Sequence, residues 1–197
     1  MLKRIFDIVF SCLGLILLAP VLVVLAIIIK LDSKGPILFI QPRVGLNNQD
    51  FNIFKFRTMY MESDKKGLLT LGNKDSRITK VGYFLRRYKI DEFPQLLNIL
   101  LGDMSFVGPR PELRKYVNYY PKEDLSVLSV RPGITGLASI EFRNEVELLK
   151  AAKDPETYFI ESIIPEKLKL NKLYIEKSSF WFDLKLIIIT IFRVLTK

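Results

Sequence analysis

Ile8–Ile29, which reads IVFSCLGLILLAPVLVVLAIII, contains no charged residue. As a helix rising ~1.5 Å per residue, this stretch would extend about 33 Å, close to the thickness of the hydrocarbon core of a bilayer. A signal peptide is one alternative. It fits poorly, because the apolar run exceeds the usual h-region of about 7 to 15 residues and residues 30–34 contain no small-residue cleavage site. The stretch therefore predicts a chain that associates with a membrane.

Pro20 lies near the middle of this apolar run. Proline lacks an N–H group and frees the carbonyl of Ile16, so we expect a kink at this point. A kinked helix can cross the membrane, or it can turn and leave by the face through which it entered. Cations on both sides, such as Lys3 and Lys30, favour the second form under the positive-inside rule. Both forms remain open from these residues.

The charge balance limits the chemistry and the partners. The chain has 30 Lys and Arg, 21 Asp and Glu, no His and a net charge of +9. Without imidazole, acid–base work near neutral pH falls to carboxylates, Lys, Tyr, hydroxyls or a metal. In a membrane-bound basic domain we expect anionic lipids and phosphorylated substrates as partners, and no nucleic acid. Cys12 lies inside the apolar run, so no disulfide framework exists and the globular part should be cytoplasmic.

Residues 37–58 predict a β-hairpin with strands Ile37–Gln41 and Phe51–Thr58. Lys55 and Arg57 share one face of the second strand, about 7 Å apart. The two cations are either a solvated strand face or a pair that faces phosphate. The polar segment Tyr60–Ser76 predicts a surface loop, which we expect to form part of a substrate pocket.

Asp91 and Glu92 are adjacent carboxylates at the start of a predicted helix, Asp91–Leu101, that ends at Gly102. Adjacent helical residues diverge by ~100°, so we expect two separate roles for the two carboxylates. An ionised Asp can attack phosphorus directly or bind Mg²⁺. The alternative is simple helix capping, with the second carboxylate paired to Arg86 or Arg87.

Two arginines lie on stiff loops. Arg110 stands between two prolines, and a rigidly held guanidinium suits bidentate binding of phosphate. The alternative is a structural salt bridge to Glu112 or Asp103. Arg131 repeats the theme on the loop Arg131–Gly136, whose spacing does not match a phosphate-binding P-loop.

The remaining sequence predicts helices at Glu145–Lys153 and at Glu156–Ser178, the second interrupted at Pro165. Residues 180–197 predict an amphipathic helix in the membrane interface, with a core-facing terminal helix as the alternative. The predicted fold class is α+β, a helix-rich, membrane-associated single domain with a short β-hairpin. It divides into a membrane-inserted helix (1–34), a cytoplasmic catalytic domain (35–179) and the interfacial helix (180–197).

Four motifs in this order resemble those of the bacterial sugar transferases, the monotopic polyprenyl-phosphate phosphoglycosyl transferases. They are Lys55–Met59 (KFRTM), Ile90–Asn98 (IDEFPQLLN), Gly102–Glu112 (GDMSFVGPRPE) and Arg131–Gly136 (RPGITG). The similarity runs from Lys3 to the region of Asp183, nearly the whole chain. The short length resembles the minimal members of this family, which consist of the catalytic unit alone.

The resemblance implies that a sugar 1-phosphate moves from a UDP-sugar to undecaprenyl phosphate at the cytoplasmic face of the bacterial inner membrane, with release of UMP. This step begins a surface glycan or glycoconjugate. It also implies that Asp91 is the nucleophile and forms an aspartyl-phosphosugar intermediate, that Glu92 assists, and that Mg²⁺ is required, with Asp91 as the metal-binding carboxylate. The substrate- and phosphate-binding candidates are Arg110, Arg131, Lys55, Arg57, Thr58 and Glu112.

The resemblance further implies a monotopic, re-entrant helix-break-helix at Pro20. The family commonly has Ser-Pro at the break, whereas this chain has Ala19-Pro20, and alanine offers no hydroxyl to a freed carbonyl. Downstream glycosyltransferases and a second copy of the chain are candidate partners. Two rival functions remain: a membrane-bound Mg²⁺-dependent polyprenyl-phosphate phosphatase or phosphotransferase, and a non-enzymatic basic membrane adaptor.

Overall fold

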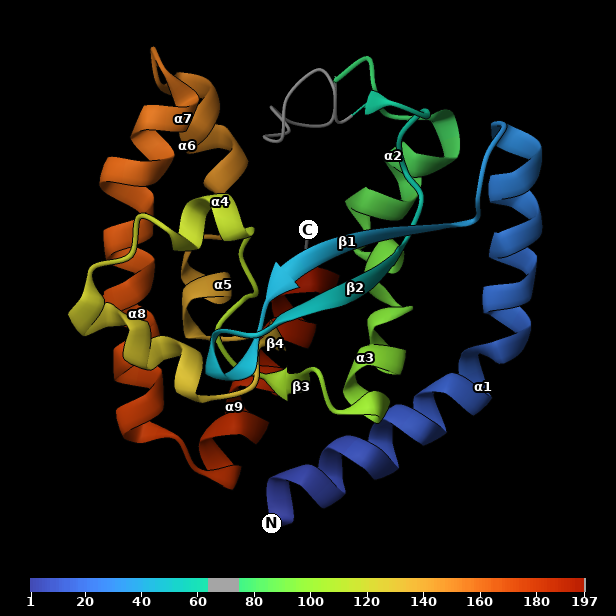
Figure 1. Ribbon diagram of the computed structural model, residues 1–197. Coiled ribbons are helices and arrows are strands. Elements are labelled where there is room, and N and C mark those ends of the chain that lie inside the picture. The colour runs from blue at the N-terminus through green and yellow to red at the C-terminus, as the bar shows by residue number, and fades with distance from the viewer. Residues whose placement is uncertain (64–74, 197) are drawn as a thin grey trace.

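The computed structural model describes residues 1–63 and 75–196, which form a helix-rich fold with two small sheets (Figure 1). The segment 64–74, which holds most of the predicted substrate loop, lies outside the described residues. The strands are β1 (Leu38–Val44), β2 (Asp50–Phe56), β3 (Ser105–Val107) and β4 (Gly133–Thr135). The helices are α1 (Leu2–Asp32), α2 (Lys80–Arg87), α3 (Gln95–Leu101), α4 (Arg114–Val117), α5 (Leu137–Glu141), α6 (Glu145–Ala151), α7 (Pro155–Tyr158), α8 (Ile164–Lys177) and α9 (Phe180–Leu195).

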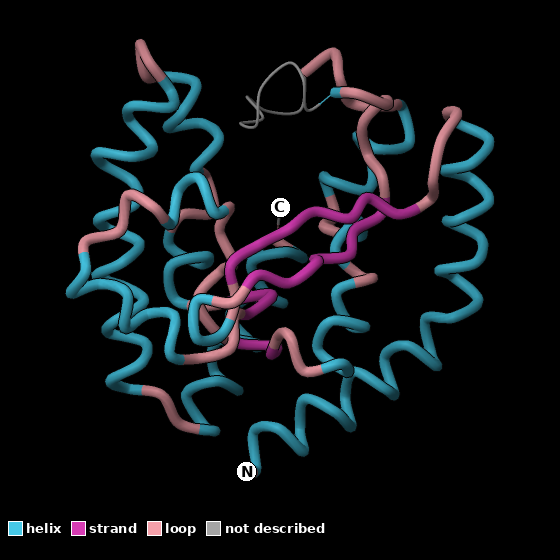
Figure 2. Tube along the Cα trace, in the orientation of Figure 1, coloured by secondary structure: helices cyan, strands magenta, loops and turns pink. Residues whose placement is uncertain are grey.

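Helix α1 is long, bent and mostly unburied. Pro20 lies inside one continuous helix, which bends, as Figure 2 shows along its length. The helix is thus bent, as expected from the proline, but without the break that the resemblance implied. A bend is the expected result of a proline in a helix interior. Among the described residues α1 is the one helix long and apolar enough to cross a membrane by length and composition, and 6% of its apolar window is buried.

Both ends of α1 are bonded to the same domain. At the N-terminal end, Lys3 Nζ donates to Val107 O at 2.7 Å and to Asp183 Oδ2 at 2.6 Å. At the C-terminal end, the Arg57 guanidinium donates to the carbonyl of Ser33 at 2.6 Å. The same domain therefore holds both ends of this bent helix, and between them Leu15 and Leu18 pack against the buried cluster that contains Leu96 and Ile99.

The predicted β-hairpin is confirmed. β1 and β2 pair antiparallel from Leu38 opposite Phe56 to Val44 opposite Asp50, so β1 runs longer than expected, through Pro42. Proline fits here because β1 is an edge strand, where a missing N–H removes no ladder bond if it points outward.

Asn98 on α3 closes the other edge of this hairpin. Its Oδ1 accepts from Phe54 N at 2.9 Å and its Nδ2 donates to Asn52 O at 2.7 Å. The side-chain amide therefore takes the place of a third strand beside β2. This contact fixes α3, and the residues before it, against the hairpin.

β3 and β4 form a short parallel pair that the sequence reading did not predict. Glycines allow the loops beyond these strands to approach closely: a Cβ on Gly108 would lie 2.4 Å from Arg131 O, and one on Gly136 would lie 2.2 Å from Gly108 O. The pairing brings the loop that carries Arg110 beside the loop Arg131–Gly136.

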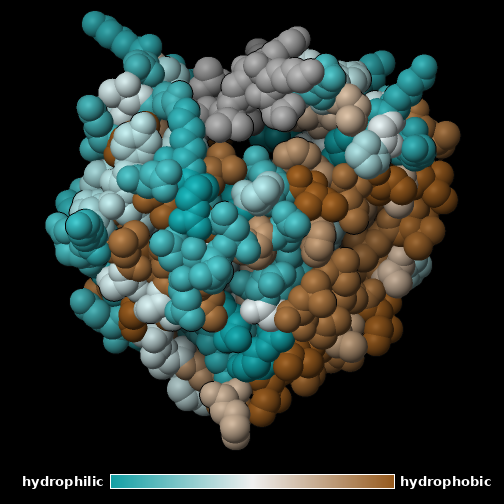
Figure 3. All heavy atoms as spheres, in the orientation of Figure 1, coloured by the Kyte–Doolittle hydropathy of each residue, from teal (hydrophilic) through white to brown (hydrophobic). Residues whose placement is uncertain are grey.

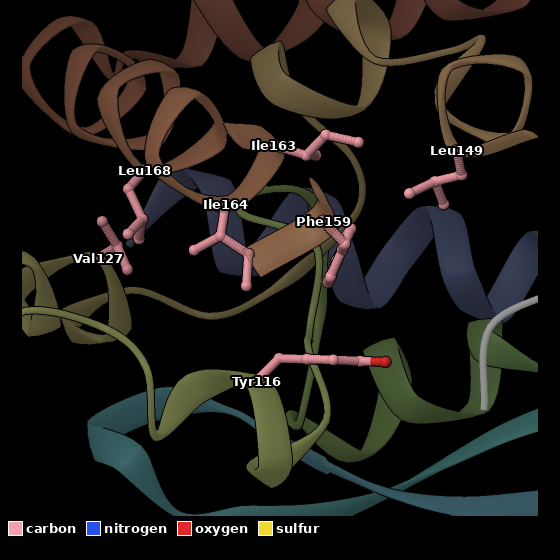
Figure 4. Packing of buried hydrophobic residues seen from close by; sticks show 7 residues of the cluster. All are labelled: Tyr116, Val127, Leu149, Phe159, Ile163, Ile164 and Leu168. Carbon is pink, nitrogen blue, oxygen red and sulfur yellow. The ribbon is translucent and has the colours of Figure 1, made fainter. Parts of the chain in front are cut away.

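A second layer of helices packs around a separate core (Figure 4). Its buried members are Tyr116, Val127, Leu149, Phe159, Ile163, Ile164 and Leu168. The predicted helix Glu156–Ser178 is interrupted as expected but at another place: the irregular turn is Phe159–Ile163, a π-helical turn. Pro165 instead lies in the first turn of α8, where no N–H donor is needed.

Helix α9 packs one face and exposes the other. Leu186 is buried against the cluster that contains Val107 and Tyr174, whereas Trp181 and Phe192 remain 75% and 64% exposed. The helix thus has a core-facing side, as expected of a terminal core helix, and an exposed apolar side, as expected of a helix in the membrane interface. Figure 3 shows apolar atoms gathered over α1 on one side of the molecule, and polar atoms over the helices opposite.

Candidate active site

Asp91 and Glu92 lie in a short helical turn, Ile90–Glu92, that leads directly into α3. Lys89 precedes the turn with φ at 59°, and Gly102 ends α3 with φ at 101°. A left-handed residue reverses the chain at each end, which glycine does without strain. The terminator Gly102 is therefore confirmed, whereas the helix begins at Gln95 and not at Asp91; Asp91 and Glu92 lie in a separate 3-10 turn before it.

Glu92 is the carboxylate that the protein itself binds. It is 8% exposed, and both guanidinium nitrogens of Arg110 donate to it, Nη2 to Oε1 and Nη1 to Oε2 at 3.5 Å. Lys55 Nζ donates to Oε1 at 3.2 Å. Burial opposes the ionisation of Glu92, but Arg110 and Lys55 outweigh it and hold the Glu92 pKa well below its usual range. Arg110 thus pairs with neither Glu112 nor Asp103, the two salt-bridge partners considered from the sequence.

Asp91 is the carboxylate that the protein leaves open. It is 9% exposed, and its Oδ1 has no hydrogen-bond partner among the described residues. Burial, and next the adjacent Glu92 charge, raise the Asp91 pKa above its ordinary value, while Lys55 and Arg86 act in the opposite direction. The two neighbouring carboxylates therefore have different surroundings.

Lys55 completes the charged centre. Burial lowers the pKa of its ammonium to about 8, although the Glu92 carboxylate raises it. A lysine so tuned changes its charge close to physiological pH. Lys55 can bind an anion beside Glu92 or donate its proton to a group bound there.

Glu112 lies in a second buried charge cluster behind Arg110. Lys167 Nζ donates to Glu112 Oε1 at 3.1 Å, and the Arg43 guanidinium lies 3.7 Å from Oε2. Burial opposes the ionisation of Glu112, but Lys167 and Arg43 keep its pKa below the usual value. Glu112 therefore anchors the Arg110 loop and does not join Asp91 and Glu92.

Three other predicted residues bond elsewhere. Arg57 donates to the C-terminal end of α1, as described above. Arg131 Nε donates to Gly102 O at 2.8 Å, at the far end of α3 from the carboxylates. The Thr58 carbonyl accepts from Thr79 N at 3.0 Å. The structure thus brings together Asp91, Glu92, Lys55 and Arg110, and places Arg57, Thr58 and Arg131 in other contacts.

Two residues at this centre were not proposed as substrate-binding from the sequence. Arg86 is half-buried and acts on the Asp91 charge; from the sequence it was considered only as a capping partner. Gln95 is 1% exposed, and neither Nε2 nor Oε1 of its amide has a partner among the described residues. Its position in the chain, four residues after Asp91, was the available signal.

The carboxylates fit a magnesium ion that is shared with a phosphorylated substrate. No group of three or more His, Cys, Asp or Glu side chains that could hold a metal occurs in the described parts of the chain. Mg²⁺, however, commonly binds through one or two carboxylates together with substrate phosphates and water. The buried, unpaired Asp91 Oδ1 is an oxygen of the type that such an ion needs.

Several known proteins are similar to this chain over nearly its whole length. The family model described as "Bacterial sugar transferase" matches residues 1–197. An undecaprenyl-phosphate glucose phosphotransferase of Komagataeibacter xylinus is 41% identical over 97% of this chain and 35% of its own length. A UDP-N-acetylgalactosamine-undecaprenyl-phosphate N-acetylgalactosaminephosphotransferase of Aeromonas hydrophila is 37% identical over 99% of this chain and 44% of its own length.

A third relative is closer in size. The UDP-glucose:undecaprenyl-phosphate glucose-1-phosphate transferase of Caulobacter vibrioides is 38% identical over 98% of this chain and 70% of its own length. The chain thus spans less than half the length of the first two relatives and most of the third. The names of the relatives include two different sugars.

Proposed function

Because this chain belongs to the bacterial sugar transferase family, we propose that it moves a sugar 1-phosphate from a UDP-sugar to undecaprenyl phosphate and releases UMP. The observation that carries the proposal is the open carboxylate oxygen of Asp91, buried beside a second carboxylate that cations already neutralise. The relatives' names supply the substrate classes. We further propose that the product begins a surface glycan or glycoconjugate.

The proposed chemistry has two displacements at one phosphorus atom. An oxygen of the Asp91 carboxylate attacks the phosphorus that bears the sugar; the bond from this phosphorus to the bridging oxygen breaks, and UMP leaves with the electron pair. An oxygen of undecaprenyl phosphate then attacks the same phosphorus, and the Asp91 carboxylate leaves. No net proton transfer is required, which suits a site without histidine.

The cations of the site have distinct tasks in this scheme. Arg110 and Lys55 hold Glu92 ionised, so that its charge is fixed before the substrate arrives. Arg86 favours the ionised, attacking form of Asp91. Preorganised cations of this kind stabilise the charge that develops on a phosphoryl group as it is transferred. Bound Mg²⁺, held by Asp91, would offset the charge of the diphosphate.

We propose that α1 is re-entrant and that the domain lies on the cytoplasmic face of the bacterial inner membrane. The bonds from both ends of α1 to the same domain support this topology, because a straight spanning helix would place its ends on opposite sides. Two single cysteines test it: Leu2→Cys and Lys34→Cys, each with Cys12→Ser, should both be labelled from the cytoplasm. One site labelled from outside would contradict the proposal.

The catalytic proposal is tested by UMP release from detergent-solubilised protein with Mg²⁺, undecaprenyl phosphate and a panel of UDP-sugars that begins with glucose and N-acetylgalactosamine. We expect release with at least one sugar, and loss of release with chelator or with Asp91→Asn. Asp50→Asn, an exposed carboxylate on the hairpin, is the matched control and should remain active. Phosphate release from undecaprenyl phosphate without any UDP-sugar would favour a phosphatase instead. Full activity of Asp91→Asn would contradict the assigned nucleophile.

A further inference from the structure

Gln95 is a fully buried amide whose hydrogen bonds are unmade. The side chain is 1% exposed, and both its Nε2 and its Oε1 lack a partner within the described residues. A buried amide without partners is costly, and native proteins rarely keep one without a reason. The proposed catalytic scheme, as described above, does not use Gln95.

Another amide of the same helix provides a comparison. Asn98 is equally buried, yet both of its amide atoms are bonded to β2. The helix is therefore well able to satisfy an amide for structural purposes. The contrast indicates that Gln95 is kept for a group that comes from outside the described chain.

The position of Gln95 places that group beside the carboxylates. Gln95 is the first residue of α3, and the turn that holds Asp91 and Glu92 ends three residues before it, so the chain brings its side chain close to both carboxylates. Helical side chains lean toward the N-terminus, which here means toward the pair. In the turn Ile90–Glu92 and the first turn of α3, the buried side-chain polar atoms without a hydrogen-bond partner are Asp91 Oδ1 and the two amide atoms of Gln95.

We propose that Gln95 is a further substrate-binding residue of this site and that it holds the sugar 1-phosphate at Asp91. Its Nε2–H donates to an oxygen of the phosphoryl group, and its Oε1 accepts from a hydroxyl of the attached sugar. A sugar 1-phosphate carries both an acceptor and a donor close together, as a primary amide requires. The inference rests on the proposed function and adds a contact to it.

The test compares Gln95→Met, which keeps the length of the side chain but removes its amide, with the same substitution at Gln49, an exposed residue of the hairpin turn. We expect Gln95→Met to lower kcat/KM by about 10-fold or more, the effect of one lost hydrogen bond to a charged group. Its melting temperature should stay the same or rise, because an unpaired amide is removed. Gln49→Met should match the wild type in both measurements.

Binding is measured separately in an Asp91→Asn background, where no transfer takes place. Addition of Gln95→Met should weaken UDP-sugar binding by a similar factor. Unchanged kcat/KM in Gln95→Met would overturn the inference. So would a fall in melting temperature with binding unchanged, which would mean that an ordered water satisfies the amide. Gln95→Glu, of nearly equal shape, replaces Gln95→Met if the latter does not fold. Failure of the wild type to release UMP would count against the proposed function and not against Gln95 alone.

Discussion

The guanidinium of Arg110 binds the carboxylate of Glu92 with both terminal nitrogens, although the two residues belong to different loops of the chain. This ion pair distinguishes two carboxylates that are adjacent in sequence. Glu92 is occupied by the protein, and Asp91 is left with an open oxygen. The different surroundings of the two carboxylates thus follow in large part from the contact between Arg110 and Glu92.

Arg110→Met should impair both stability and activity. It leaves the buried Glu92 carboxylate with Lys55 as its remaining ion-pair partner, and an uncompensated buried charge destabilises strongly. Since Arg110 keeps 33% of its side chain exposed, we expect a loss of roughly 3 kcal/mol or less in the free energy of unfolding. Loss of one preorganised donor should lower kcat/KM by about 10²-fold or more.

A double variant separates the two effects. Arg110→Met with Glu92→Gln removes both charges, so chemical denaturation should show most of the stability restored, while activity stays low. Equal instability of the single and the double variants would mean that the pair contributes nothing as a pair.

The acid limb of the pH profile should report on Asp91. The proposed attack requires the ionised Asp91 carboxylate, and burial raises its pKa, so kcat/KM should fall as the pH drops at values above the ordinary carboxyl range of ~4. Arg86→Gln removes a cation that lowers the Asp91 pKa and should therefore move this limb to higher pH. A limb that stays in place in Arg86→Gln would contradict the electrostatic effect of Arg86 on Asp91.

The alkaline limb should report on Lys55. Its pKa is lowered to about 8, mainly by burial, so its positive charge is present below that pH and lost above it. If Lys55 helps to bind the diphosphate, KM for the UDP-sugar should rise as the pH passes about 8. Lys55→Arg stays charged throughout this range and should flatten the limb. A limb of unchanged position in Lys55→Arg would assign it to another group.

Asn98→Leu should loosen α3, the helix that follows the turn with the two carboxylates. The substitution leaves Phe54 N and Asn52 O without their present partner, and each unsatisfied backbone group costs about 1–3 kcal/mol. We expect a lower melting temperature together with a lower kcat. Asn98→Asp keeps the bond from Phe54 N but places a buried carboxylate beside Asp103, to which Asn98 Nδ2 now donates at 3.3 Å, so it should lose at least as much stability. Wild-type stability of Asn98→Leu would show that the hairpin does not need this amide.

Much of the fold could be predicted from local signals. The hairpin followed from alternating residues and turn residues, and the helix after Asp91 followed from its leucines and Gly102. The parallel pair β3 and β4 could not be predicted, since strands of three residues have no readable periodicity. The ion-pair partner of Arg110 could not be predicted either, because the sequence does not show which of the carboxylates of Glu92, Glu112 and Asp103 lies next to it in the fold.

The candidate site was only partly predicted, because the sequence does not show which group each cation binds. Motif residues such as Arg57 and Arg131 have the right chemistry for phosphate, yet the structure uses them on the carbonyl ends of α1 and α3. A cation near a helix C-terminus is a common structural contact, and sequence spacing does not distinguish it from a substrate contact. Gln95 is the opposite case. Its residue type indicates no function, and only its burial without hydrogen-bond partners points to one.

The small hairpin has one further property. On the outer side of β2, Asn98 occupies the hydrogen-bonding groups of Phe54 and Asn52. On the outer side of β1, Pro42 offers no N–H group and Val44 N already donates to Glu112 O. Strands with free edges recruit other strands, a hazard that grows where copies are crowded on a two-dimensional surface. Near Asn52 and Phe54 on one margin, and near Pro42 and Val44 on the other, this sheet therefore offers a further strand no free hydrogen-bonding groups of these kinds.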